Sequence, residues 1–124
     1  CPDEIRVRLL LIDAPERSQR PFGGAAAMQL ELLLPRGSRV SLELDVRAVD
    51  QYGRTLAYVF SEDGRMINEE MVRSGYALVL VYPPNVRYVE RIRAAAAEAR
   101  AERRGLWHTT GFECTPREHR RRLC

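Results

Sequence analysis

The sequence predicts a single α+β domain. Short segments in which apolar and polar residues alternate are typical of half-buried strands, and two longer segments rich in strong helix formers are typical of helices. The strands and helices do not alternate regularly, as they would around a parallel sheet. A length of 124 residues is enough for one domain and too short for two.

The first part of the chain reads as a strand, a loop and a helix. Residues 5–12 begin with apolar alternation and continue as an apolar run, which predicts a strand that the Asp-Ala-Pro sequence at 13–15 ends. Residues 16–24 are polar and contain proline and two glycines, so we expect a mobile loop. Residues 25–34 predict a helix that ends before Pro35 and Gly37.

The middle of the chain predicts two longer strands. In residues 39–46 the apolar side chains face one way and the polar side chains face the other. A turn at 50–53 leads to a strand at 55–60, and residues 65–67 could add a short one. Asn68 is then expected to cap a short helix that ends before Gly75.

The last part predicts a short strand, a long helix and a tail. Residues 78–81 form the strand, and residues 86–104 form a helix that stops at Gly105. The expected domain spans residues 1–107, and residues 108–124 are expected to be a loosely ordered tail.

Composition favours a soluble protein with an anionic partner. Hydrophobic residues make up 45% and charged residues 30%, and no apolar run is long enough to span a membrane. All twenty basic residues are arginine, whose planar fork grips phosphate with two hydrogen bonds. Codon bias in a GC-rich genome is the preferred explanation for the missing lysines. The net charge of +3 favours a polyanion only weakly.

Localisation is indicated by two features. No signal peptide is visible, which fits either a cytoplasmic protein or a mature form from which the signal was removed. Cys1, Cys114 and Cys124 form an odd set, in which a bridge from Cys1 to a tail cysteine could form in a secreted protein.

Three polar clusters could carry chemistry. The first joins Arg8, Asp13 and Glu16 at the end of a strand, where two carboxylates and an arginine suit metal-assisted phosphoryl chemistry. Taken alone, it is more typical of a surface ion pair before a proline turn, because such turns are frequent.

The second cluster lies in a turn and the third lies before a rigid Pro-Pro pair. Gly53 allows an unusual backbone turn before Arg54, which could supply another phosphate-binding fork, and Tyr52 could stack or donate. Tyr82 could form the wall of a base pocket. Alternatively, these residues form an ordinary hairpin turn and a core tyrosine.

Together the clusters resemble the staphylococcal nuclease (thermonuclease) family. The resemblance covers most of the chain, and its motifs occur in the family's order. The motifs are RLLLIDAPE at 8–16, DQYGRTLAYVF at 50–60, INEEMVRSGYA at 67–77, YPPN at 82–85 and GLW at 105–107. The resemblance implies a fold that is mainly a β-barrel, an OB-fold Greek-key barrel with five strands and three helices.

The resemblance also implies an activity, calcium-dependent (Ca²⁺) endonucleolytic hydrolysis of phosphodiester bonds in DNA and RNA with low sequence specificity. Asp13 and the backbone carbonyl of Ala14 correspond to calcium ligands. Glu16 corresponds to the residue that activates the attacking water, and Arg8 and Arg54 correspond to the arginines that bind the scissile phosphate.

The nucleotide site implied by the resemblance contains three further residues. Tyr52, Tyr82 and Gln51 match residues that line it, and recognition through base faces favours single-stranded substrates. The family's common habit of secretion predicts an extracellular or periplasmic protein.

One departure from the family lies at the start of the chain. The family has two strands before the first strand found here, and their turn carries another calcium-binding aspartate. We therefore expect a barrel that lacks its first two strands and exposes part of its core. Truncation, a second chain that supplies the strands, or a different closure would explain this. The alternative function is a catalytically impaired module that binds nucleic acid or a protein partner.

Overall fold

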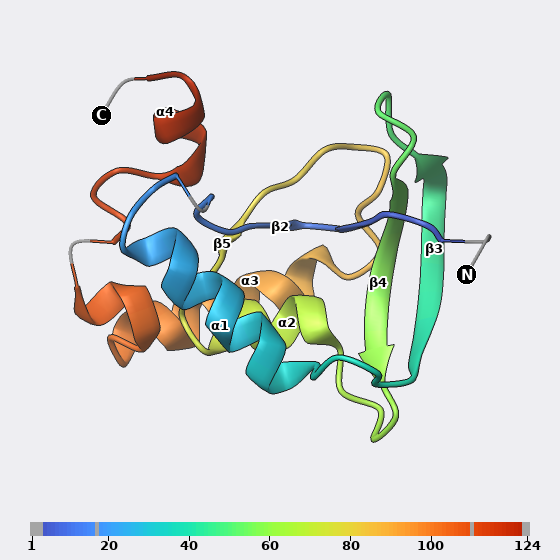
Figure 1. Cartoon of the computed structure of the whole chain (residues 1–124), viewed down its shortest axis with the longest axis horizontal. Coiled ribbons are helices and arrows are strands. Elements are labelled where there is room, and N and C mark those ends of the chain that lie inside the picture. The colour runs from blue at the N-terminus through green and yellow to red at the C-terminus, as the bar shows by residue number, and fades with distance from the viewer. Residues whose placement is uncertain (1–3, 17, 110, 123–124) are drawn as a thin grey trace.

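The computed structural model describes residues 4–16, 18–109 and 111–122. It is an α+β structure, as predicted, and Figure 1 shows its arrangement. In chain order, the elements are β1 (Val7–Leu9), β2 (Ile12–Asp13), α1 (Phe22–Leu33), β3 (Val40–Val49), β4 (Thr55–Ser61), α2 (Ile67–Arg73), β5 (Leu78–Val79), α3 (Val89–Ala101), the 3-10 helix η1 (Gly105–His108) and α4 (Pro116–Arg120).

The strands form two sheets. One contains three strands in the order β1-β4-β3, with β1 parallel and β3 antiparallel to β4. The other pairs β2 with β5 in antiparallel fashion. Within the described ranges these sheets do not close into a barrel, so the structure supports the α+β class and leaves the expected five-stranded barrel unconfirmed.

The predicted strand at 5–12 is divided in two. Leu11 has a φ of 67°, a left-handed conformation that leucine rarely adopts, and it separates β1 from β2. The amide of Leu10 still donates to Ala57 of β4, whereas the carbonyl of Leu11 accepts from Leu80 next to β5. The bend therefore transfers the chain from one sheet to the other.

The helices lie on both sides of β2. In Figure 1, α1, α2 and α3 lie below β2, and α4 lies above it. Ile67, Met71 and Ile92, from α2 and α3, are almost fully buried and form the centre of the hydrophobic core with Tyr58 of β4. No helix in the described part of the chain combines the length and the apolar character needed to cross a membrane.

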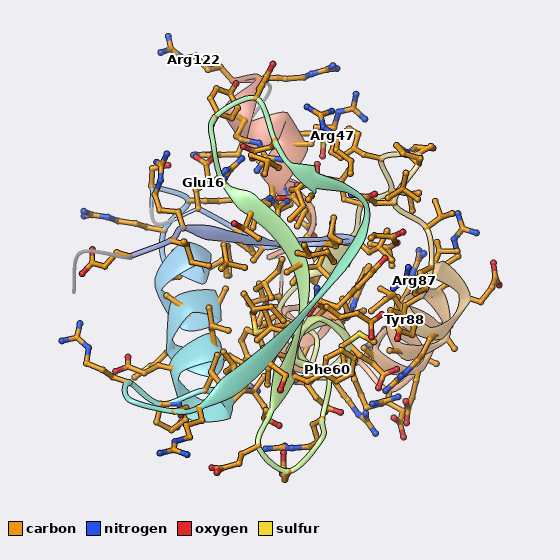
Figure 2. The ribbon with its side chains drawn as sticks, turned by 90° about the vertical axis from the view of Figure 1, so that its right-hand side faces the viewer. Glu16, Arg47, Phe60, Arg87, Tyr88 and Arg122 are labelled. Carbon is orange, nitrogen blue, oxygen red and sulfur yellow. The ribbon has the colours of Figure 1, made fainter. Side chains whose placement is uncertain are left out.

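The start of α3 is fixed against the larger sheet. The Tyr88 ring centroid lies 4.7 Å from that of Tyr58 and 6.3 Å from that of Phe60. The Tyr88 hydroxyl donates to Glu43 of β3, and Arg87 forms an ion pair with the same carboxylate at 2.8 Å. Arg87 and Tyr88 are labelled in Figure 2. The predicted helix at 86–104 is correct in kind, but the helix itself spans only Val89–Ala101.

The apolar side of β3 is exposed. Val40, Leu42, Leu44 and Val46 keep 42%, 37%, 44% and 74% of their surface accessible, respectively. They alternate along the strand as the sequence predicts, but the described residues cover them only in part. This side of β3 is therefore an exposed apolar surface in the described part of the chain.

Asn68 has a different role from the predicted one. Helix α2 begins after Met66, so Asn68 lies inside the helix and does not cap it. Its buried side chain donates to the carbonyls of Leu10 and Ala57 and accepts from the amide of Val59. Asn68 thus ties α2 to the junction of β1 and β4. The predicted short strand at 65–67 is also wrong, because only a single bridge joins Met66 to Phe60.

The described residues after Trp107 form several contacts and the short helix α4. The ring centroids of Trp107 and Phe112 lie 4.7 Å apart. Cys114 is disulfide-bonded. Thr115 caps α4 in a reciprocal arrangement with Glu118. Cys1 and Cys124, the other cysteines of the bridge considered above, lie outside the described residues.

Candidate active site

All eight side chains predicted for the site line one cleft of about 790 Å³. The cleft lies between the β1–β2 bend, the turn before β4 and the segment after β5. Figure 2 shows Glu16 at the end of the molecule that carries α4. The predicted residues in the lining are Arg8, Asp13, Ala14, Glu16, Gln51, Tyr52, Arg54 and Tyr82.

The Arg8 side chain is held by hydrogen bonds to the backbone of the bend between β1 and β2. Its Nη1 donates to the carbonyl of Leu9 and its Nη2 to that of Ile12, both at 2.8 Å. Nη2 also lies 3.9 Å from Asp13. Burial lowers the pKa of Arg8, Asp13 opposes this shift, and the positive charges of Arg54 and Arg120 add to it. The cleft therefore concentrates positive charge around a half-buried guanidinium, which favours an anion.

Asp13 forms its tightest contact with a residue that the motif analysis does not include. Arg120 of α4 donates from Nη1 to Oδ1 at 3.0 Å and from Nη2 to Oδ2 at 2.6 Å. The same guanidinium lies 3.7 Å from Glu16. The contact raises the pKa of Arg120, chiefly through its hydrogen bond to Asp13. Because Asp13 is only 6% exposed, this pair is largely shielded from solvent on the carboxylate side.

Arg54 is oriented by the turn that precedes it. Asp50 accepts hydrogen bonds from the amides of Tyr52 and Arg54, and its other oxygen accepts from Arg54 Nε at 2.7 Å. Gly53 has a φ of 78°, so the turn uses the glycine as predicted. Burial acts to raise the pKa of Asp50, but the three hydrogen bonds together lower it. Because the contact with Asp50 uses Nε, Asp50 does not engage the two terminal nitrogens of Arg54, which lines the cleft.

Two solvent-exposed tyrosines, Tyr52 and Tyr82, line the cleft. Tyr52 and Tyr82 keep 64% and 66% of their surface accessible. The guanidinium of Arg54 lies 5.5 Å from the centre of the Tyr52 ring. Tyr82 is not the core residue that the alternative interpretation described, since it is exposed. Asn85, three residues later, bonds to both backbone groups of Arg47 and so fixes the segment after β5 against β3.

Sequence reasoning missed Arg120 and the orienting role of Asp50. Asp50 was identified only as a turn residue, although an aspartate four residues before an arginine is a signal for such a pair. Arg120 carries no local signal, because the run at 120–122 does not distinguish the residue that enters the cleft from its neighbours.

The described residues of the cleft do not offer the set of ligands that a calcium ion needs. Calcium prefers six to eight oxygen ligands, usually including several carboxylates. Among the described residues, no group of at least three acidic, histidine or cysteine side chains could hold a metal ion, and Arg120 uses both Asp13 oxygens. The residues as arranged therefore do not fit calcium. They do fit an anion flanked by Arg8 and Arg54, with the carboxylate of Glu16 nearby.

Comparison with known proteins gives consistent matches. The model of the family described as "Staphylococcal nuclease homologue" matches residues 6–109. The chain is 34% identical over 113 residues to "Endonuclease YncB" of Bacillus subtilis (strain 168), covering 86% of this chain and 53% of that protein. It is 38% identical over 107 residues to "Thermonuclease" of Staphylococcus intermedius, covering 82% and 62%, respectively. The chain thus spans less than two thirds of either relative.

Proposed function

Because the chain belongs to the staphylococcal nuclease family, we propose that it is an endonuclease that hydrolyses phosphodiester bonds in nucleic acid. The observation that carries the proposal is the convergence of Arg8, Glu16 and Arg54 in one cleft. Those residues come from two segments that are distant in sequence, and the parallel pairing of β1 with β4 brings them together. The names of the relatives, endonuclease and thermonuclease, support the same reaction class.

In the proposed reaction, each side chain has one task. Arg8 and Arg54 donate hydrogen bonds to the non-bridging oxygens of the phosphate and bind more strongly as negative charge increases in the transition state. Glu16, whose side chain is 43% exposed, accepts the proton of a water that attacks phosphorus. The bond from phosphorus to the leaving oxygen then breaks, and that oxygen takes a proton from solvent water, so that an alcohol and a phosphate monoester are released. Arg8 keeps donors for this task because its contacts with Leu9 and Ile12 use two of its five N–H groups.

The proposed substrates are DNA and RNA, with single strands favoured. Tyr52 and Tyr82 stand exposed on the cleft, where they can stack on unpaired bases. Stacking is tolerant of sequence, and phosphate contacts carry no sequence information. Gln51 lines the same cleft and would contribute a polar contact. We therefore propose low sequence specificity.

Calcium dependence is part of the proposal because of the family. The contact between Arg120 and Asp13 limits when calcium could bind. The candidate ligands are Asp13 and the carbonyl of Ala14, both in the lining. Asp13 can bind a cation only when Arg120 no longer occupies its oxygens.

Secretion is proposed on separate grounds. Cys114 is disulfide-bonded, and disulfides persist mainly in oxidising compartments. This supports an extracellular or periplasmic protein.

The proposal is tested by the release of fragments from single-stranded DNA. We expect acid-soluble fragments in the presence of calcium and none after the addition of a chelator, with activity restored by excess calcium. Internal cleavage is checked with a circular single strand, which an exonuclease cannot degrade. The absence of any cleavage of DNA or RNA over a range of calcium concentrations would reject the enzyme proposal.

One observation favours a second candidate, a module that binds nucleic acid without cleaving it. The pairing of Asp13 with Arg120 leaves the cleft cationic and without a metal-binding group among the described residues. In that case, single-stranded DNA would bind to the cleft and remain intact, and calcium would not strengthen the binding. The fragment assay and a calcium titration of DNA binding separate the two candidates.

Replacing Asp50 by alanine is expected to lower hydrolysis by about tenfold, because Arg54 loses the charge-assisted hydrogen bond that orients it. Initial rates on a short oligonucleotide would measure the effect. Asp63→Ala is the matched control, since Asp63 pairs with Arg65 at 3.0 Å in a turn that does not line the cleft. Equal rates for Asp50→Ala and the wild type would show that hydrolysis does not require the hydrogen bond from Arg54 to Asp50.

A further inference from the structure

Helix α4 presents a row of arginines beside the cleft. Arg117, Arg120 and Arg121 are separated by helical spacing, which places them on one face of the helix, here called the arginine face. The Arg121 amide donates to the carbonyl of Arg117 at 3.1 Å, so the helical geometry extends to Arg121. Arg120 lines the cleft and pairs with Asp13. Arg117 and Arg121 are exposed next to it.

Most of the charge on the arginine face is not neutralised by the protein. In the described part of the chain, this face forms ion pairs only through Arg120, with Asp13 and Glu16. The carboxylate of Glu118, on the same helix, instead accepts from the amide of Thr115 at the helix start. Like charges three or four positions apart on a helix repel each other. The arginine face therefore carries a repulsion that a bound polyanion would relieve.

Contacts on other sides of α4 hold it in place. The His119 ring lies 3.0 Å from the Ser18 hydroxyl, and Gln19 donates to the carbonyl of Cys114. Pro116 is almost fully buried at the start of the helix. A docked helix offers its arginines from a fixed backbone, so less conformational entropy is lost when they bind a ligand than in a free tail.

We propose that the arginine face of α4 continues the nucleic-acid-binding surface of the cleft and binds phosphates of the same single strand beyond the cleaved bond. The inference rests on the proposed function and assigns to it a substrate several nucleotides long. Arg120 connects the two surfaces, because it lines the cleft and lies beside Arg117 and Arg121. In Figure 2, Glu16 of the cleft and Arg122, which follows the arginine face, lie at the same end of the molecule.

The chemistry of the arginine face fits a phosphate backbone. A guanidinium offers a planar fork to phosphate oxygens, and contacts with phosphate do not depend on the base sequence. A positively charged surface that follows the backbone is typical of proteins that bind single strands. Because α4 lies beyond residues 6–109, this surface belongs to a part of the chain that the family match does not include.

The test removes the two exposed guanidinium groups together, in the double variant Arg117→Gln and Arg121→Gln. Fluorescence anisotropy, with a chelator present so that hydrolysis does not interfere, measures the binding of a long thymidylate strand. We expect the double variant to bind this strand about tenfold more weakly than the wild type at low salt. The slope of log affinity against log salt should fall by about 1.4, because each phosphate contact on a single strand contributes about 0.7. A dinucleotide with one phosphate fills only the cleft and should bind both proteins equally.

The matched control is the double variant Arg36→Gln and Arg39→Gln. Both residues are exposed, lie between α1 and β3, and do not line the cleft. The control removes the same amount of charge away from α4 and should leave the affinity for the strand and the salt slope unchanged.

Three results would overturn the inference. They are an unchanged salt slope in the α4 variant, an equal loss of affinity in the control variant, and an equal loss for the dinucleotide and the long strand. If the α4 variant binds the strand more weakly but the wild type cleaves no nucleic acid, the binding surface holds and the proposed hydrolysis fails. If the wild type cleaves DNA and the α4 variant binds the strand as tightly as the wild type, the hydrolysis holds and the inference fails.

Discussion

Replacing Glu16 by glutamine is expected to lower the rate of phosphodiester hydrolysis by about 10²–10⁴-fold, the usual contribution of a general base. Glutamine has nearly the same shape as glutamate but cannot accept a proton from water at neutral pH. Glu16 lines the cleft with Arg8 and Arg54, so the substitution removes the base and keeps both phosphate-binding side chains. Single-turnover rates on a short single-stranded oligonucleotide would measure the effect on the chemical step.

The binding of the substrate separates a lost base from a damaged cleft. We expect Glu16→Gln to bind the oligonucleotide at least as tightly as the wild type, because one negative charge near the phosphate is gone. Glu62→Gln is the matched control, since Glu62 is exposed in the turn after β4 and does not line the cleft. A rate for Glu16→Gln within twofold of the wild type would exclude Glu16 as the base.

The candidate site was predictable to the extent that it depends on local sequence. Arg8, Asp13 and Glu16 lie within nine residues, so a strand end and a proline turn already confine them to one region. The approach of Arg54 depends on the parallel register that pairs Arg8 with Leu56. No local pattern specifies that register, and only the resemblance to the nuclease family indicated it.

Arg120 could not be predicted in the same way. Its contact with Asp13 joins residues that are 107 positions apart. The family motifs end before α4, so the resemblance gave no information about that helix. The sequence at 120–122 reads as a solvated basic run, and a surface role is the ordinary interpretation of such a run. The docking of α4 by Gln19 and Ser18 decides which arginine reaches the cleft.

The fold shows the same division between local and long-range information. The alternation in β3 and the glycine in the turn before Arg54 were read correctly, because each depends on a few neighbouring residues. The bend at Leu11 was not foreseen, since leucine gives no signal of a left-handed conformation. Its cause is long-range: Leu10 bonds to Ala57 of β4 in one sheet, and Leu11 bonds to Leu80, which directly follows β5 of the other sheet.

Replacing Asn68 by alanine is expected to lower the free energy of unfolding by about 3–4 kcal/mol, which is a large part of the stability of a typical domain. The Asn68 side chain is fully buried, and its removal leaves the carbonyl of Leu10 and the amide of Val59 without their partner. Each unsatisfied buried group costs about 1–3 kcal/mol. Urea denaturation followed by circular dichroism would measure the loss as a lower midpoint.

Asn85→Ala is the control for this loss in the free energy of unfolding. Asn85 is also buried and also bonds to two backbone groups, but both belong to Arg47 and lie at the edge of the cleft. We expect a loss for Asn85→Ala of about half that for Asn68→Ala, because water can reach the freed groups at an edge more easily. Equal losses would mean that the β1–β4 junction has no special role. A larger loss for Asn68→Ala would show that α2 holds the bend from which Arg8 and Asp13 enter the cleft.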